Sequence, residues 1–217
     1  ILAINSFHLS SMKSFVALVL SSCGLLAVQA ADTRTTCLPY DDIVDKSMAS
    51  FNLDLYEGLW YVASTNEPTE PAFCKCDIFN WTVTSPTEFL DTDTTTCGSM
   101  EPTTLNIGGT LSTDPSRMGM LREGMPPLFP LIDNFVLYVE TDEAGGYNAT
   151  IRYSCKENYN VPTPPFHFKL FESIQIWTRE KVASQETLDR LFGIAVNMGI
   201  IALDSFDTYK NLTYTGC

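Results

Sequence analysis

The stretch that decides the fold is "YEGLWYVAST", Tyr56 to Thr65, in which Gly58 stands two positions before Trp60. The run that follows the glycine alternates in the manner of a half-buried strand. Trp60 then belongs either to an ordinary core or to the turn that opens a barrel. The segments downstream distinguish these two interpretations.

Short alternating segments separated by turn signals continue along the rest of the chain. They predict eight strands, and their spacing suits an up-and-down all-β domain. The proline-rich pieces at 125–130 and 161–165 are predicted to be loops, because proline cannot donate to a sheet ladder. The predicted strands cover 59–65, 76–84, 87–97, 103–112, 117–124, 134–142, 147–155 and 166–179.

One segment has a helical period instead. Apolar side chains recur at helical spacing between Ser184 and Gly199, which predicts one amphipathic helix with Ser184 as its N-cap and Gly199 as its end. Eight antiparallel strands that close into a barrel have no free edges and leave room for side chains or one small ligand. We therefore predict an all-β, eight-stranded antiparallel up-and-down β-barrel (calyx), with this C-terminal α-helix packed outside.

The composition limits the partners of the protein. The chain has 217 residues, 45% of them hydrophobic, which suffices for one well-packed domain. Its formal net charge is −13, so its field repels phosphate backbones and anionic membrane surfaces. No stretch after the N-terminal region approaches the roughly 20 apolar residues of a spanning helix. We expect no nucleic-acid partner and no stable membrane insertion.

Residues 1–30 are predicted to be a leader and a signal peptide. Met12 and Lys13 precede the apolar run "FVALVLSSCGLLAV", and Val28 and Ala30 are placed as the small residues of a cleavage site. The residues before Met12 have no structural period. We expect a secreted, extracellular protein with a single domain over 31–217.

Cysteines and sequons point to the same oxidising compartment. Removal of the leader leaves six cysteines, which suggests three disulfides, although their number alone does not choose the pairs. No metal site is expected, because Cys74-Lys75-Cys76 lacks structural-zinc spacing and His167 is the only histidine after the leader. Three sequons predict glycosylation, at Asn80, Asn148 and Asn211.

Three ordered signatures resemble those of the lipocalin family, in particular its apolipoprotein D group. Gly58-Leu59-Trp60 resembles the G-x-W motif that begins the first strand. Thr141-Asp142 resembles the turn between the sixth and seventh strands, and Arg179 resembles the arginine that closes the eighth strand ahead of the helix. The turn after Asp142 is longer than the family usually carries, so Tyr147 is not equated with the family tyrosine.

The resemblance implies a structural role for these residues. Trp60 would lie at the closed end of the barrel with Arg179 across its face, an aromatic–guanidinium contact of about 0.5 to 2 kcal/mol. Gly58 would allow the tight entry into the first strand, and Thr141-Asp142 would form a turn. The function is then expected on the barrel walls and at the opposite mouth.

The resemblance also implies two of the three disulfides, and it leaves Cys74 and Cys97 to be paired. If Thr84 faces Thr87 around the intervening turn, the same register places Cys74 opposite Cys97, where Cβ atoms lie about 4.5–5.5 Å apart. Exchange of Cys74 with Cys76 stays open, because residues i and i+2 lie on one face of a strand. The two implied disulfides are Cys37–Cys155 and Cys76–Cys217.

A barrel plugged at one end makes a calyx whose inner wall comes from alternate strand residues. Such a wall favours an elongated apolar molecule such as a fatty acid, steroid, retinoid, carotenoid or bilin. Arg122 or Tyr153 could meet a carboxylate or keto end of the ligand, and the alternative for Arg122 is an ordinary solvated charge at the end of a strand. A register error of one residue would exchange the set for its neighbours. The predicted ligand-binding residues are Val62, Met118, Met120, Phe135, Leu137, Val139, Ile151, Tyr153, Leu170, Ile174 and Ile176.

The predicted function is secreted binding and transport of a small lipophilic ligand, with no required cofactor. A pigment protein that holds a non-covalent bilin or carotenoid chromophore is the alternative within the binding class. Pigment-carrying family members commonly assemble, so a homo-oligomer is possible. A lipocalin-type enzyme, an isomerase or a xanthophyll de-epoxidase-like protein, is the second alternative. We predict no enzymatic activity, because one histidine and no free thiol exclude the usual Ser-His-Asp and Cys-His arrangements.

Overall fold

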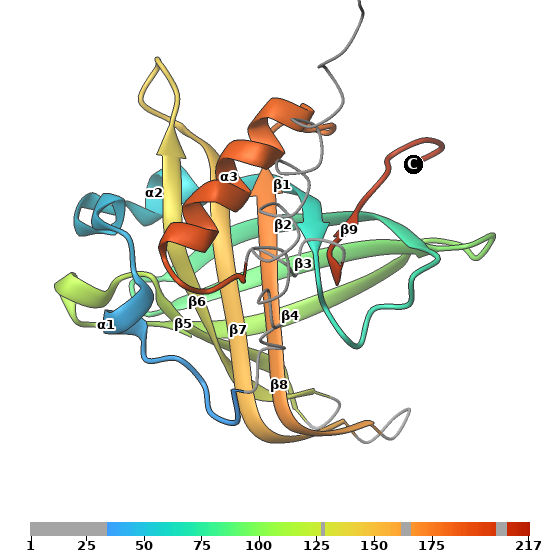
Figure 1. The fold of residues 1–217 in the computed structure, drawn as a ribbon, viewed down its shortest axis with the longest axis horizontal. Coiled ribbons are helices and arrows are strands. Elements are labelled where there is room, and N and C mark those ends of the chain that lie inside the picture. Colours follow the sequence, from blue (N-terminus) through green and yellow to red (C-terminus); the bar gives the residue numbers. More distant parts are fainter. Residues whose placement is uncertain (1–33, 127–128, 162–165, 203–207) are drawn as a thin grey trace, which may run out of the picture. The chain divides into compact units, whose positions relative to one another are not determined.

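The computed structural model describes residues 34–126, 129–161, 166–202 and 208–217. The predicted leader at 1–30 lies outside these ranges. Within them, the chain forms an antiparallel barrel with one long helix on its outer surface (Figure 1). No helix of the described residues is long and apolar enough to cross a membrane.

Eight strands follow one another around the barrel, as predicted. Each pairs antiparallel with the next, and β1 pairs with both β8 and β2, which closes the sheet. Closure removes the exposed edges that an open sheet would present. The strands are β1 (Gly58–Thr65), β2 (Cys74–Ser85), β3 (Glu88–Cys97), β4 (Thr103–Leu111), β5 (Met120–Met125), β6 (Phe129–Thr141), β7 (Tyr147–Val161) and β8 (Phe166–Thr178).

β6 and β7 extend furthest beyond their predicted bounds, and a ninth strand is additional. β5 includes Met125 and β6 includes Phe129 and Pro130, so the prediction that 125–130 is a loop is wrong at both ends. The proline is tolerated because the β5–β6 ladder is irregular there and pairs Met125 with Phe129. β7 continues to Val161, and β9 (Lys210–Asn211) pairs with β1. The rest of the second predicted loop, 162–165, lies outside the described residues.

The predicted helix is confirmed as α3 (Gln185–Asn197). The Ser184 hydroxyl accepts a hydrogen bond from the Thr187 amide at 3.1 Å, and Gly199 ends the segment with a φ of 73°. The apolar side of α3, which includes Leu191 and Ala195, packs on the outer face of β6, β7 and β8 (Figure 1).

Four short helical turns were not predicted from the sequence pattern. A side-chain acceptor begins three of them, since Asp45, Asn52 and Asp114 each accept a hydrogen bond from the amide two residues further on. A helical turn of three to five residues contains too few apolar side chains to show a period in the sequence. They are α1 (Tyr40–Ile43), η1 (Lys46–Ser50), α2 (Leu53–Tyr56) and η2 (Pro115–Arg117).

Two large clusters of buried apolar side chains lie on opposite faces of the barrel wall. The outer cluster joins α3 and the segment around α1 to β6, β7 and β8, and includes Leu191 and Ile151. The inner cluster surrounds Trp60, Trp81 and Trp177. Strands β6 to β8 are therefore buried on both faces.

The β2–β3 hairpin contains a bulge beside its cysteines. Pairing begins with Ser85 opposite Glu88, so the predicted pair Thr84–Thr87 does not occur. A further register shift between Lys75 and Ile78 brings Cys74 opposite Cys97, and Cys76 lies within that shift with a φ of 57°. The three disulfides of the structure are Cys37–Cys155, Cys74–Cys97 and Cys76–Cys217.

Candidate functional site

The closed end of the barrel is built around Trp60 and Arg179. Trp60 is fully buried, donates from its indole nitrogen to the Tyr56 carbonyl at 2.8 Å, and has the Arg179 guanidinium 3.8 Å from its ring centroid. The guanidinium also donates to the carbonyls of Leu59 at 2.7 Å and Glu57 at 2.6 Å. These contacts tie the entry of β1 to the end of β8 and close the barrel floor.

Two turns next to this floor use the motif residues. Gly58 has a φ of 95°, a conformation that residues with a Cβ rarely adopt, which permits the tight entry into β1. Between β6, which ends at Thr141, and β7, the Asp142 carboxylate accepts hydrogen bonds from the amides of Ala144 and Gly146, both at 2.9 Å. The carboxylate therefore holds the longer turn in shape.

A cavity of about 310 Å³ lies inside the barrel beyond the floor. Phe79 and Trp177 stack with their ring centroids 4.3 Å apart and belong to both the cavity wall and the inner cluster. Residues of the β1–β2 and β5–β6 connections complete the wall. Its other apolar side chains are Leu105, Ile107, Met125, Phe129, Ile132, Tyr159 and Phe171.

A fully buried arginine lies behind the wall of this cavity. The guanidinium of Arg152 contacts the Trp177 ring at 3.9 Å and forms ion pairs with Glu123 at 3.2 Å and Asp91 at 3.6 Å. Asp91 also accepts from the Trp81 indole at 2.6 Å. Burial and the charge of Glu123 nevertheless raise the pKa of Asp91 well above its ordinary value. The arginine thus holds two carboxyls in the barrel interior.

Asp77 and Asp93 form a carboxyl pair on the cavity wall. The Thr95 hydroxyl lies 2.6 Å from Asp77 Oδ1 and 3.1 Å from Asp93 Oδ1. Burial raises the pKa of Asp77 well above its ordinary value, with the charge of Asp93 adding to the effect, and burial raises the pKa of Asp93 to about 6. One hydroxyl has a single hydrogen to donate, so a proton on one carboxyl completes the hydrogen bonding of the trio.

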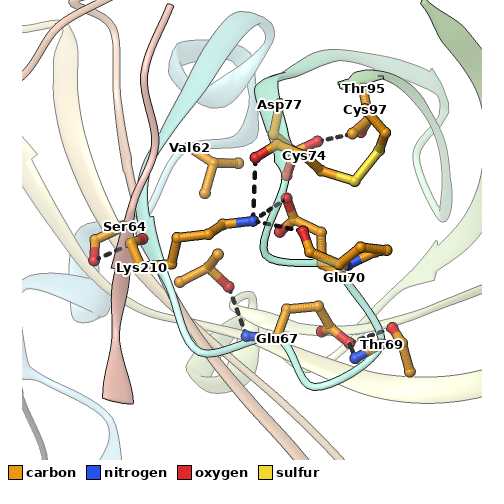
Figure 2. Close-up of polar contacts among 12 residues, drawn as sticks. Val62, Ser64, Glu67, Thr69, Glu70, Cys74, Asp77, Thr95, Cys97 and Lys210 are labelled. Atoms are coloured by element: carbon orange, nitrogen blue, oxygen red, sulfur yellow. Dashed lines mark hydrogen bonds and ion pairs between the residues drawn. A yellow bond between two sulfur atoms is a disulfide. The ribbon is translucent and has the colours of Figure 1, made fainter. Parts of the chain in front are cut away.

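Two glutamates of the β1–β2 connection lie on the same wall (Figure 2). Glu67 accepts from the hydroxyl and the amide of Thr69 at 2.5 and 3.1 Å, and burial raises the pKa of its carboxyl. Glu70 forms an ion pair of 2.6 Å with Lys210, which reaches across from β9. Lys210 also donates to the carbonyls of Pro71 and Cys74 at 3.3 and 3.4 Å, so it holds this connection against β9.

None of the predicted ligand-binding residues lines this cavity. The prediction placed them inward, whereas the structure puts most of them on the other face of the wall, because α3 and the N-terminal segment bury that face as well. The alternation of apolar and polar residues along a strand cannot identify the inner face where both faces are apolar. Phe135, Leu137, Ile151, Tyr153, Ile174 and Ile176 belong to the outer cluster, with Met120 and Leu170 packed against it. Val62, Val139 and Met118 belong to or contact the inner cluster.

The polar groups predicted to meet a ligand also lie elsewhere. Arg122 is exposed and pairs with Asp133, and the Tyr153 hydroxyl donates to Glu172 at 2.8 Å on the outer face. Arg152, one residue before Tyr153, is the residue whose side chain lies on the inner face of β7. Sequence reasoning missed it, together with Asp77 and Asp93; the alternation of Asp91, Asp93 and Thr95 along β3 was the signal that could have found this polar face.

The remaining predicted positions lie at or near the surface. Asn80 and Asn211 are exposed and Asn148 is half-buried, and glycosylation of all three stays a prediction. His167 is exposed and contacts Asn160. The described residues contain no group of three or more His, Cys, Asp or Glu side chains placed to hold a metal ion.

A closed eight-stranded antiparallel barrel with a plugged floor, an interior cavity and one helix packed outside has the lipocalin fold. Comparison with solved structures agrees. Lobster apocrustacyanin A1 is similar over 84% of this chain and 91% of its own, with 17% sequence identity and a TM-score of 0.60. Insecticyanin from the tobacco hornworm Manduca sexta is similar over 76% and 82%, with 15% identity and a TM-score of 0.54.

A siderocalin, Ex-FABP, described as functioning through dual ligand specificities, is similar over 74% of this chain and 95% of its own, with 9% identity and a TM-score of 0.50. No family model and no curated protein matches the chain. At these sequence identities the structural likeness establishes the fold, and the function is argued from the cavity itself.

Proposed function

We propose that this chain is a secreted member of the lipocalin family, similar to the apolipoprotein D group, that binds and carries a small, mainly apolar ligand inside its barrel. The observation that carries the proposal is the cavity of about 310 Å³, whose wall combines apolar and aromatic side chains with a few polar groups. Concave sites of this composition are typical of small-molecule binding. The lipocalin fold and the three disulfides support the proposal.

The proposal is tested by native mass spectrometry of protein purified from its source and by displacement of the fluorescent lipophile N-phenyl-1-naphthylamine from delipidated protein. Leu105→Trp, which fills part of the cavity, should weaken probe binding by about tenfold or more. Leu131→Trp, at an exposed position outside the cavity, should leave it unchanged. Absence of any bound lipophile together with absence of probe binding would overturn the proposal.

A coloured ligand is the alternative within this function. Five aromatic side chains of the cavity wall offer stacking surfaces to a conjugated bilin or carotenoid. Absorbance between about 350 and 700 nm of protein purified from its source separates a chromoprotein from a colourless carrier. The aromatic residues are Phe79, Phe129, Tyr159, Phe171 and Trp177.

A binding role is favoured over cysteine-based catalysis. Cys74 and Cys97, the two cysteines of the cavity wall, are joined to each other and hold no thiolate. We expect no free thiol in the secreted protein when it is unfolded without reduction and titrated with a thiol reagent. A reactive thiol in that titration would favour the lipocalin-type isomerase instead.

A further inference from the structure

We propose that the cavity selects ligands with a protonated nitrogen, so that the carried molecule is an amine with an apolar body. The inference rests on the proposed binding function and specifies the ligand class of the same site. The nitrogen would lie against the part of the wall that Asp77, Asp93 and Asn134 form. Two independent features of the cavity support it: a set of carboxyl groups whose ion pairing is incomplete, and one unpaired oxygen.

The charge of the wall has a single sign. The described lining residues include five carboxyl groups and no lysine, arginine or histidine side chain. A cavity wall of this kind attracts cations and disfavours a fatty acid or another carboxylate. The net charge of −13 of the whole chain acts in the same direction at long range. The five carboxyls are those of Glu67, Glu70, Asp77, Asp93 and Glu123.

The ion pairing of the wall is incomplete. Behind the wall, Arg152 pairs with Glu123, and Lys210 pairs with Glu70. Within the described part of the chain, no ion pair reaches the remaining carboxyls, whose side-chain contacts are mainly with hydroxyl groups. Figure 2 shows these contacts for Glu67 and Asp77. An ammonium group would supply an opposite charge to the ionised members of this set, in place of the proton that Asp77 and Asp93 otherwise share. The remaining carboxyls are Glu67, Asp77 and Asp93.

Asn134 provides an observation that does not depend on charge. It lines the cavity, is 4% exposed, and donates from its side-chain nitrogen to Glu123. Its Oδ1 is buried and has no hydrogen-bond partner among the described residues. A buried acceptor without a donor is unfavourable, and proteins seldom leave one unpaired. The oxygen is covered in the empty protein, and an ammonium N–H that reaches it on binding would satisfy it, whereas a carboxylate ligand would not.

The apolar part of the cavity wall determines what the body of the ligand is made of. Phe79, Trp177 and Ile107 line the same cavity and can bury a hydrocarbon or aromatic body. Aromatic faces also attract a cation that lies over them. A ligand with an apolar body and one protonated nitrogen therefore matches both parts of the wall.

The test compares three probes that share one apolar body: decylamine, decanol and decanoate. Each displaces N-phenyl-1-naphthylamine from the full-length secreted protein at pH 7.5. We expect decylamine to bind at least about tenfold more tightly than decanol and decanoate. The double substitution Asp77→Asn and Asp93→Asn should abolish this preference while decanol affinity stays the same, which also shows that the variant is folded.

The matched control replaces two exposed carboxyls outside the cavity, Glu101→Gln with Glu143→Gln, and should keep the preference. If the double variant does not fold, Glu67→Gln serves instead, with a smaller loss of decylamine affinity expected. Equal or tighter binding of decanol or decanoate would overturn the amine inference and leave the binding function standing, as would a preference that survives in the cavity variants. Failure of the naphthylamine probe itself to bind, together with the absence of any bound lipophile in protein purified from its source, would overturn the binding function.

Discussion

The guanidinium of Arg152 lies 3.9 Å from the ring centroid of Trp177 inside the barrel, and only 1% of the arginine is exposed. The guanidinium forms ion pairs with both Glu123 and Asp91, at nitrogen–oxygen distances of 3.2 and 3.6 Å. One cation therefore serves two carboxyls of the barrel interior, and the three groups form a charged layer against the Trp177 and Trp81 rings. Such a layer is sensitive to the loss of any of its members.

The substitution Arg152→Met retains much of the apolar side chain and removes the charge. We expect the free energy of unfolding to fall by about 3–5 kcal/mol, because Asp91 and Glu123 would remain buried without a counter-charge. Urea denaturation followed by tryptophan fluorescence measures the change. Arg122→Met removes the exposed pair with Asp133 and should change the free energy by less than about 1 kcal/mol. Equal effects of the two substitutions would contradict this account of Arg152.

Two adjacent glycines of β4 should differ in their tolerance of alanine. A Cβ at Gly109 would lie 2.0 Å from Cζ of Phe89 and 2.8 Å from the Arg122 carbonyl oxygen, whereas a Cβ at Gly108 would meet nothing within 4 Å. We expect Gly109→Ala to destabilise the protein by about 1–3 kcal/mol and Gly108→Ala to be neutral or slightly stabilising. Thermal unfolding followed by circular dichroism compares them, and an equal Tm would show that Phe89 moves aside at little cost.

The fold could be predicted because its signals are local. The alternation of each strand, the turn residues between strands and the Ser184 cap are read from neighbouring residues, and the eight strands and α3 appear where these signals place them. The closed end was predicted instead from the resemblance of the G-x-W segment and Arg179 to lipocalin motifs, and the contact between Trp60 and Arg179 confirms it. β9 escaped prediction because two residues show no period.

The cavity could not be predicted because it depends on which face of a strand is inward. On β7, Ile151 and Tyr153 are buried, yet they lie on the outer face, which α3 and the N-terminal segment cover, and Arg152 between them is the inward residue. Hydrophobicity assigns the wrong face wherever a helix buries the outer one. The bulge at Cys76 adds a second shift, and it lies between the tertiary disulfides Cys74–Cys97 and Cys76–Cys217, which composition does not predict.

The floor should depend on the planar group of Arg179 rather than on its charge alone. Arg179→Lys keeps the charge but loses the guanidinium face on Trp60 and most of the hydrogen bonds to the carbonyls of Leu59 and Glu57. We expect a loss of about 1–3 kcal/mol in unfolding free energy with probe affinity unchanged in the folded protein. Arg190→Lys, in an exposed pair with Glu140, is the control and should have a small effect. A selective loss of probe binding would instead place Arg179 in the ligand site.

Because of the Asp93 carboxyl, the ligand-free protein should be more stable at mildly acidic pH than at neutral pH. Burial raises the pKa of Asp93 to about 6, with the charges of Glu70 and Glu123 adding to the effect and the hydrogen bond with Asp77 opposing it. Between about pH 4 and pH 6 the folded state therefore holds a proton that the unfolded chain has lost. Stability from this group is full below that window and falls as pH rises through it.

We therefore expect Asp93→Asn to raise the free energy of unfolding at pH 7.5, by about 2 kcal/mol, and to have little effect near pH 4.5. The measurement is urea denaturation of the unsubstituted protein and of Asp93→Asn between pH 4.5 and pH 7.5. The difference between their free energies of unfolding is compared across this range, because the contributions of the other carboxyls cancel in it. Asp114→Asn is the control of opposite sign, because hydrogen bonds from Ser116 lower the pKa of Asp114 and its removal should be unfavourable at pH 7.5. A difference for Asp93→Asn that is independent of pH would mean that its carboxyl ionises in the folded barrel as it does in water.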